Sequence, residues 1–134
     1  MIEERTIKIN GKDIQVRYCL AAEQGFEALS GKSIEVFNPA ITESDEDGNP
    51  TKFDMPAATT KDYAELAFAA IVAAYERNGQ ECPLEPNEIL YNTPREELQE
   101  LITAVIELRM KWYNIPSVVK PETDKSPEDQ EKNA

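Results

Sequence analysis

One segment of the chain constrains the fold more than any other. Residues 66–75 are apolar at every position and rich in alanine, within a predicted helix of residues 61–78. Thr59 is a candidate N-cap of this helix, Asp62 lies near the positive end of its dipole, and Gly79 is a C-terminal stop. A helix that is apolar nearly all round must be covered on several sides, by its own chain or in an oligomer. The alanines allow neighbouring backbones to approach it closely.

A β-hairpin is predicted at the N-terminus. Apolar and polar side chains alternate over residues 6–9 and again over residues 14–18. Between the two runs stands Asn10-Gly11, a dipeptide that tolerates the positive φ angles of a type I′ turn. Because an isolated hairpin is only marginally stable, its apolar face must pack against another part of the chain.

Three shorter segments lie between this hairpin and the apolar helix. A helix is predicted over residues 21–30, ended by Gly31 in the left-handed conformation. Residues 33–37 alternate and predict a third, short strand, stopped by Asn38-Pro39. Residues 39–58 have no periodicity and carry many acidic residues, glycine and proline, so we expect an exposed loop or insertion.

The C-terminal half is predicted to be helical until a tail begins. A short helix is expected over residues 86–91, and a longer one from Thr93, where Thr93 and Glu96 match a capping box with Pro94 at the first helical position. The apolar stripe of the longer helix is Leu98, Leu101, Ile102, Val105, Leu108 and Trp112. The acidic segment 117–134 has two prolines and no apolar period, and is predicted to be disordered.

Together these elements predict one α+β domain over residues 1–116, a hairpin followed by three to four helices. The net charge is −12, from 26 acidic and 14 basic residues, which disfavours nucleic acid and anionic membranes and favours a basic protein partner.

Cys19 and Cys82 are too far apart to form a metal motif, and we expect both to be thiols. No signal peptide or membrane span is apparent, so we expect the protein in the cytoplasm.

The sequence argues against catalysis. It contains no histidine, the commonest general base and metal ligand at neutral pH. It also contains no glycine-rich nucleotide loop and no nucleophile elbow. We therefore expect a protein that is not an enzyme and has no cofactor.

One acidic segment partly matches a calcium-binding loop. Glu43, Asp45, Asp47 and Gly48 stand at positions 1, 3, 5 and 6 of an EF-hand-like loop, with Asp54 at position 12. Both end positions carry a residue other than the usual one, and no helix is predicted to enter the loop. A solvated acidic turn is the favoured interpretation, and calcium binding stays open.

Four aromatic residues are candidates for partner binding, since interfaces are enriched in aromatic side chains. Trp112 and Tyr113 end a helix just before the predicted tail, where an exposed anchor is plausible. Phe68 and Tyr75 are candidates on the apolar helix, although helical spacing is more typical of a core position.

The order of these segments resembles a known family. The residues that carry the resemblance are 7–18 with their Asn-Gly turn, Phe26-Glu27-Ala28-Leu29-Ser30-Gly31-Lys32, and the stretch from Tyr63 to Gly79. They are similar to the tail assembly chaperones of long-tailed bacteriophages and prophages. The resemblance covers roughly residues 5–113 and rests on general features rather than on a catalytic signature.

The resemblance implies a function by binding alone. It implies that the protein coats the tape-measure protein, helps to recruit tail-tube subunits, tends to form homo-oligomers and is absent from the finished particle. An acidic exterior around an apolar groove would keep a long helical partner in solution. Two other classes stay open: a structural or connector subunit of the particle, and a small regulatory module such as an antitoxin or anti-repressor.

Overall fold

The computed structural model describes residues 2–114, and they form an α+β fold with an N-terminal antiparallel hairpin, as the sequence predicts. Strands β1 (Glu4–Ile9) and β2 (Lys12–Arg17) are followed by α1 (Leu20–Ser30) and a 3-10 helix, η1 (Ile34–Phe37). A second hairpin, β3 (Ala40–Ser44) and β4 (Pro50–Asp54), precedes α2 (Thr60–Arg77), α3 (Pro86–Tyr91) and α4 (Arg95–Trp112). The predicted boundary at residue 116 and the predicted tail 117–134 lie outside the described residues.

The first hairpin forms around the predicted turn. Asn10 and Gly11 have φ angles of 51° and 83°, the left-handed values that a type I′ turn requires. Ile7 pairs with Ile14 across the ribbon, and the buried face is continued by Ile9 and Val16. This face packs on α2 and α4, which explains why the hairpin is stable in this chain.

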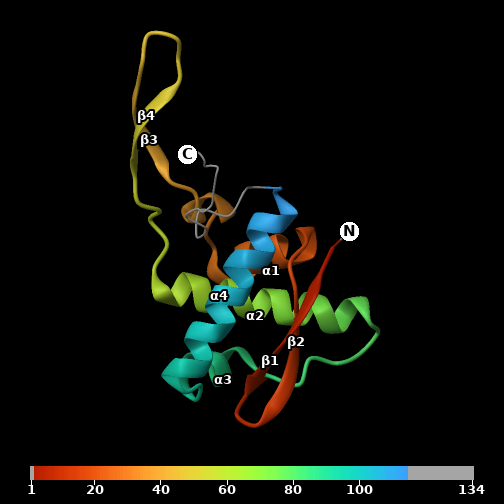
Figure 1. Cartoon of the computed structure of the whole chain (residues 1–134). Helices are drawn as coiled ribbons and strands as arrows, with labels where there is room; N and C mark the ends of the chain where they lie inside the picture. The colour runs from red at the N-terminus through yellow and green to blue at the C-terminus, as the bar shows by residue number, and fades with distance from the viewer. Residues whose placement is uncertain (1, 115–134) are drawn as a thin grey trace, which may run out of the picture.

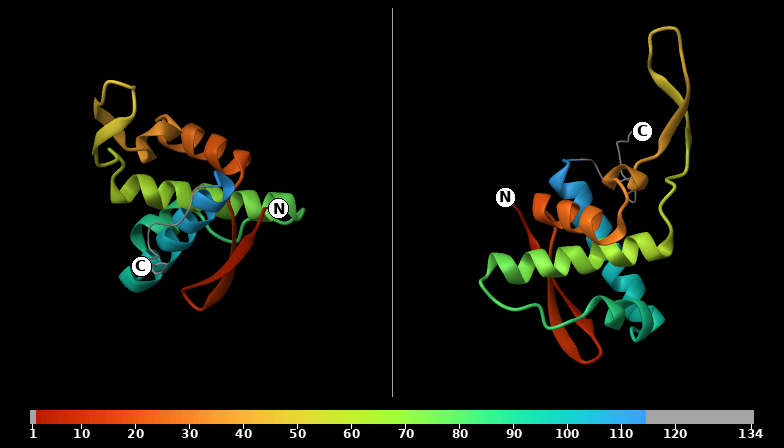
Figure 2. Two further views of the ribbon diagram at one scale, coloured as in Figure 1. Left: turned by 45° about the horizontal axis from the view of Figure 1, so that its top comes forward. Right: turned by 180° about the vertical axis from the view of Figure 1, so that it is seen from behind.

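Helix α2 is the centre of the fold. In Figures 1 and 2 it runs through the middle of the molecule, with α1 on one side and the first hairpin and α3 on the other. Leu66, Ala67, Ala70 and Ile71 are each 0–1% exposed. Burial within a single chain therefore explains most of the apolar character of α2.

The start of α2 is fixed by a capping box. The Thr59 hydroxyl accepts a hydrogen bond from the Asp62 amide, and the Asp62 carboxylate accepts one from the Thr59 amide. Lys32 Nζ donates to both carboxylate oxygens of Asp62, at 2.9 and 3.1 Å. Burial alone would raise the pKa of Asp62, but the bonds from Thr59 and Lys32 outweigh it and hold that pKa below its usual value.

The capping box predicted at Thr93 does not form. Pro94 is the N-cap of α4, no side chain caps this helix, and the Thr93 hydroxyl donates instead to the carbonyl oxygen of Glu88 at 2.9 Å. The connection between α3 and α4 is short. The Thr93 hydroxyl therefore bonds a free carbonyl oxygen at the C-terminal end of α3 and not a free amide at the start of α4.

The third strand predicted at residues 33–37 is also wrong. Most of this segment is the 3-10 helix η1, whose first turn is held by the Ser33 hydroxyl accepting from the Glu35 amide. A strand would send Ile34 and Phe37 to opposite faces, whereas the tighter turn lets Ile34, Val36 and Phe37 all pack on the core. Phe37 stacks edge-on against Phe26 and Tyr63, with centroid distances of 4.9 Å to each.

Residues 39–58 are exposed, as predicted, but they are not an irregular loop. Strands β3 and β4 pair antiparallel, with Ile41 opposite Phe53 and with register irregularities near Glu43. Every residue of both strands is exposed. We call residues 40–55 the arm, because Figure 1 and the right-hand view of Figure 2 show them projecting far from the helices.

Most buried apolar side chains of the described residues outside the arm form one cluster that runs from β1 to α4. We call this part the body. Between Ile2 and Asn114, none of the helices has both the length and the hydropathy that crossing a lipid bilayer would take.

Candidate functional site

A hollow lined mainly by apolar side chains lies between α1 and α2. It has a volume of about 230 Å³. Seven of its eight lining residues are apolar or glycine: Ala21, Gly25, Leu29, Phe68, Ala69, Val72 and Ala73, with Glu76 at one end. Such a hollow can receive one or two large apolar side chains from another molecule.

Small residues create this hollow. A Cβ atom at Gly25 would lie 3.2 Å from the Cβ of Ala69, so the two helices approach each other as closely as glycine permits. On either side of this contact, alanines at 21 and 73 leave space that larger side chains would fill. The alanines of α2 predict that another segment packs closely against it, and that segment is α1.

The rim of the hollow is apolar and accessible. Leu29, in the last turn of α1, is 41% exposed, and Phe68 and Val72 are half-buried on α2. Leu20, which begins α1, is also exposed. The hollow and its rim therefore leave apolar surface uncovered in the described part of the chain.

Phe68 is the one predicted partner-binding residue that lies in this hollow. Tyr75 contacts β2 instead: its hydroxyl accepts a hydrogen bond from the Gln15 amide at 3.3 Å. Both side chains are half-buried and pack against the core. Partner binding by Phe68 remains a prediction that its position supports, while Tyr75 is engaged with the first hairpin.

Trp112 and Tyr113 lie together at the end of α4, with ring centroids 4.9 Å apart. Trp112 is half-buried and packs edge-on against Tyr18 at 5.7 Å. The Tyr113 ring is partly exposed, but its hydroxyl donates to the carboxylate of Glu23 in α1. Among residues 2–114, no aromatic pair and no side-chain hydrogen bond joins Trp112 or Tyr113 to Phe68 or Tyr75.

Glu23 is the central acceptor of a polar network that joins α1 and α4 to Tyr18, the residue after β2. It is 7% exposed and accepts hydrogen bonds from the hydroxyls of Tyr18, at 2.6 Å, and Tyr113. Arg109 Nε lies 3.9 Å from the same carboxylate and donates to the Tyr18 oxygen, while its Nη2 donates to Asn38. A buried charge satisfied on several sides holds these elements in one arrangement.

Both tyrosines of this network are protonated donors at neutral pH. Burial and the bond to Glu23 raise the pKa of Tyr18 above its ordinary value. The same two causes, burial first, raise the pKa of Tyr113. Both hydroxyls therefore donate hydrogen bonds that hold α1 and α4 together.

The acidic end of the arm is a turn. One Asp45 carboxylate oxygen accepts hydrogen bonds from the amides of Asp47, at 2.9 Å, and Asn49, at 2.8 Å. Gly48 has a φ of 84° and closes the turn. Among residues 2–114, no group of three or more acidic, cysteine or histidine side chains has an arrangement that could hold a metal ion.

Cys19 and Cys82 are both free and half-buried. Burial raises the pKa of the Cys82 thiol, and its sulfur donates to the carbonyl oxygen of Leu84 at 3.4 Å. A thiol with a raised pKa is a poor nucleophile, which agrees with a packing role.

Neither the hollow nor the role of Glu23 is predicted by the sequence patterns. The signal for the hollow was the glycine at 25 inside a predicted helix, since a helical glycine often marks a close contact. Glu23 gave no signal, because an acidic residue in a first turn is usually solvated.

We compared the chain with protein-family models, with curated proteins and with solved structures, and none of the three comparisons found a match.

Proposed function

We propose that this protein is a non-enzymatic assembly chaperone, which binds an apolar stripe on a helical partner through the hollow between α1 and α2. The resemblance of the sequence to phage tail assembly chaperones makes the tape-measure protein the proposed partner. Recruitment of tail-tube subunits and action in the host cytoplasm belong to the same proposal.

The observation that carries this proposal is the accessible apolar lining of the hollow. Leu29, Phe68 and Val72 offer contact to a partner from two helices, while small residues keep the floor open. The geometry suits a helix that presents a leucine or phenylalanine, as in helix-in-groove recognition. A net charge of −12 would keep the resulting complex soluble.

The size of the hollow favours weak and reversible binding. Burial of one large apolar side chain contributes about 1.5–3 kcal/mol, which alone gives no tight complex. A long partner with repeated apolar positions would be covered by several copies at once, and each copy could leave separately. Reversibility is what a chaperone needs if it is to be displaced during assembly.

The test is co-expression with the tape-measure protein of the same phage or prophage. We expect the partner to become soluble and to co-purify with the wild-type chain. Leu29→Glu should abolish co-purification because it places a charge at the rim of the hollow. Ile106→Glu is the matched control: Ile106 is 37% exposed on α4, compared with 41% for Leu29, and lies outside the hollow.

An insoluble partner in the presence of the wild-type protein would contradict the proposed function. If Leu29→Glu and Ile106→Glu reduce co-purification equally, or if neither reduces it, the hollow is not the binding site. Circular dichroism of both variants shows whether the helices are retained.

The arm favours a second candidate, a structural or connector subunit. A hairpin that projects from the body and packs on none of its helices is suited to reach a neighbouring subunit in a particle. Detection of the protein in purified particles by mass spectrometry would favour this candidate over the chaperone.

A further inference from the structure

The arm carries an uncovered apolar face. Ile41 and Phe53 are directly opposed in the ribbon and are 58% and 56% exposed, and Met55, just beyond β4, is 86% exposed. Side chains two residues apart point to the same side of a strand, so Met55 continues the face that Phe53 begins. A two-stranded ribbon with its apolar face in water is marginally stable, which indicates that another surface covers it.

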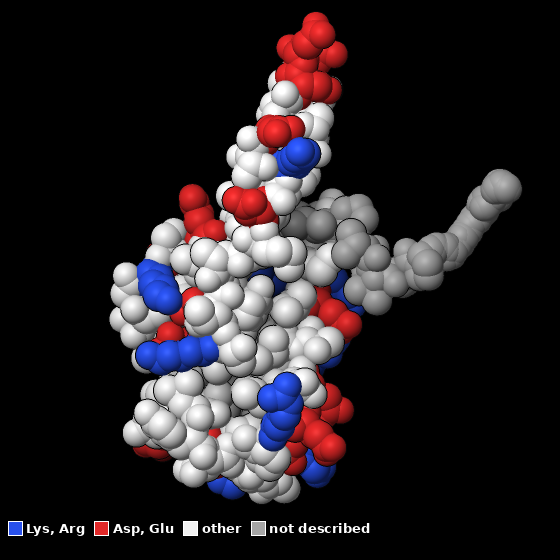
Figure 3. All heavy atoms as spheres, turned by 90° about the vertical axis from the view of Figure 1, so that its left-hand side faces the viewer, with Lys and Arg blue, Asp and Glu red and all other residues white. Residues whose placement is uncertain are grey.

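Acidic side chains surround this apolar face. Figure 3 shows them crowded at the outer end of the arm. The arm holds one lysine, Lys52, whose Nζ lies 3.6 Å from Glu43. Its acidic residues are Glu43, Asp45, Glu46, Asp47 and Asp54. The surface that covers the arm should therefore be apolar at its centre and basic at its edge.

The body has a groove of this kind between the N-terminal parts of α2 and α4. It is lined by Thr60, Arg95, Leu98, Gln99, Ile102 and Thr103. Leu98 and Ile102 are half-buried and supply the apolar centre. Arg95 lines the groove and supplies a basic edge, and Lys61 is the next residue after Thr60 in α2.

Arg95 has no acidic partner in the described part of the chain, and Lys61 has one distant partner. Among the described residues no carboxylate lies within 4.0 Å of Arg95, and Lys61 reaches only Glu65, at 4.0 Å. Most other basic side chains of residues 2–114 have closer acidic partners. In a chain with nearly twice as many acidic as basic residues, an unpaired arginine beside an apolar groove indicates a site for an acidic surface.

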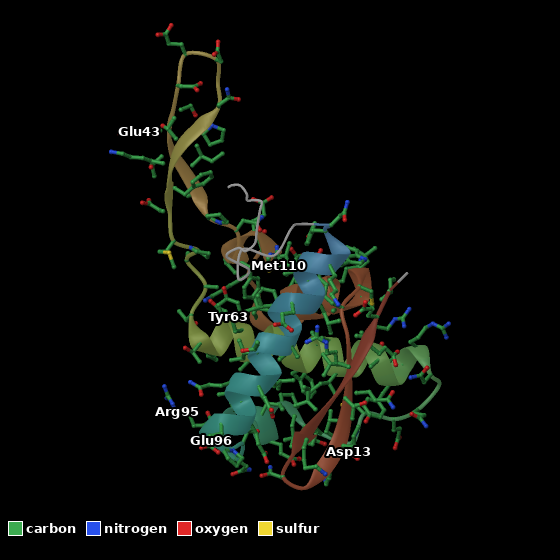
Figure 4. The ribbon with its side chains drawn as sticks, in the orientation of Figure 1. Asp13, Glu43, Tyr63, Arg95, Glu96 and Met110 are labelled. Carbon is green, nitrogen blue, oxygen red and sulfur yellow. The ribbon has the colours of Figure 1, made fainter. Side chains whose placement is uncertain are left out.

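The arm of the same molecule does not occupy this groove. In Figure 4, Arg95 lies at the start of α4, whereas Glu43 lies on the arm, which points away from α4. The exit of the arm is tied to the body by a hydrogen bond from the Ala58 amide to the Val36 carbonyl oxygen, at 3.0 Å. A second copy holds its own arm in the same projecting position, so that arm is available to enter the groove of the first copy.

We propose that two copies of the chain associate by exchanging arms, so that β3–β4 of each copy lies in the α2–α4 groove of the other. Such an exchange is two-fold symmetric and closed, and it buries the apolar face of both arms. Two five-residue strands, their loop and the six groove residues approach the roughly 20–30 residues per side of a specific interface.

The net charge of −12 opposes any association of two copies. At physiological ionic strength, however, the Debye length is about 8 Å, so repulsion between distant charges is largely screened. The groups that face each other in the exchange have opposite sign, which favours this contact over other pairings of two acidic molecules.

The first experiment is sedimentation equilibrium of the full chain over a wide range of concentration. We expect a monomer–dimer equilibrium. Ile41→Ser/Phe53→Ser and, separately, Arg95→Glu should weaken dimerisation about tenfold or more. Lys12→Glu is the matched control, since Lys12 is exposed at the first hairpin and undergoes the same charge change. All of these positions are exposed, and an acidic residue in the first turn of α4 is compatible with its helix dipole.

The second experiment mixes the arm variant with Arg95→Glu. The first has an intact groove and the second an intact arm, so one complete arm–groove contact forms only between the two different chains. We expect the mixture to contain more dimer than either variant alone. A wild-type chain that is monomeric at every concentration overturns the proposal, as does a dimer that both variants retain or a mixture with no more dimer than its components.

Discussion

The two hairpins of this protein have the same topology and opposite surroundings. In the first, Ile9, Ile14 and Val16 are 0–1% exposed beneath α2 and α4. Its turn is also held, because the Asn10 amide donates to Glu97 and the Asn10 side chain donates to the Asn92 carbonyl. In the arm no residue is buried. The body thus covers the apolar face of its own hairpin, whereas the apolar face of the arm is left for another molecule to cover.

The local chemistry of the two ribbons differs as well. The first hairpin pairs without interruption over six residues on each strand, whereas the arm has two register irregularities. An apolar face packed on helices specifies register strongly, and an exposed ribbon specifies it weakly. The irregular pairing of the arm follows from its missing cover.

The largest effect should come from the same substitution made in each hairpin. Ile14→Ala removes a side chain that is 1% exposed and should lower the free energy of unfolding by about 2–5 kcal/mol. Ile41→Ala removes one that is 58% exposed and should change it by less than about 0.5 kcal/mol in the monomer. Urea denaturation at low protein concentration measures both. Equal losses would mean that the arm is part of the core.

Substitutions in the Glu23 network should lower the free energy of unfolding by a smaller amount. This network supplies polar contacts between elements of the body. Tyr18→Phe removes a buried donor to Glu23 and should cost about 1–3 kcal/mol of stability. Tyr113→Phe removes a donor with a partly exposed ring and should cost less. Thermal unfolding of the two variants shows which one is less stable. A larger loss of stability for Tyr113→Phe would show that Tyr18 is not the main donor to Glu23.

The smallest of these losses should be seen in a pair of aspartates. Asp62→Asn should cost about 1 kcal/mol at pH 7, since it removes the charge from the capping box and from the bond to Lys32. Asp45→Asn, in the turn of the arm, should leave the free energy of unfolding nearly unchanged.

The contribution of Asp62 to the free energy of unfolding should decrease at low pH. Because the pKa of Asp62 is lowered in the folded state, its contribution is present above the unfolded value of about 3.9 and is lost as the pH falls through the folded pKa. The difference between wild type and Asp62→Asn should therefore narrow below about pH 4. A difference that stays constant from pH 7 to pH 3 would contradict this role.

Local signals in the sequence predict most of the body. The Asn10-Gly11 turn, the α1 stop at Gly31 and the whole of α3 agree with the structure, because each is set by residues that are adjacent in the chain. Thr93 shows the limit of such signals. It matches a capping box, yet the end of α3 competes for its hydroxyl.

The arm and the Glu23 network could not be predicted for two different reasons. The arm buries neither face, so its strands have no alternation of apolar and polar residues, and only Asp47-Gly48 indicates a turn. Glu23 is buried by Tyr113 and Arg109, which follow it by about 90 residues, and no local pattern reports such a contact. The hollow likewise depends on the docking of α1 against α2.

Amide hydrogen exchange across the whole chain, at low and at high protein concentration, tests the contrast between body and arm most directly. We expect β1, β2 and α2 to be protected at both concentrations. The arm amides should exchange rapidly at low concentration and become protected at high concentration, when a second copy covers them. An arm that is as protected as β1 and β2 in the dilute protein, or one that stays unprotected when concentrated, would contradict the account.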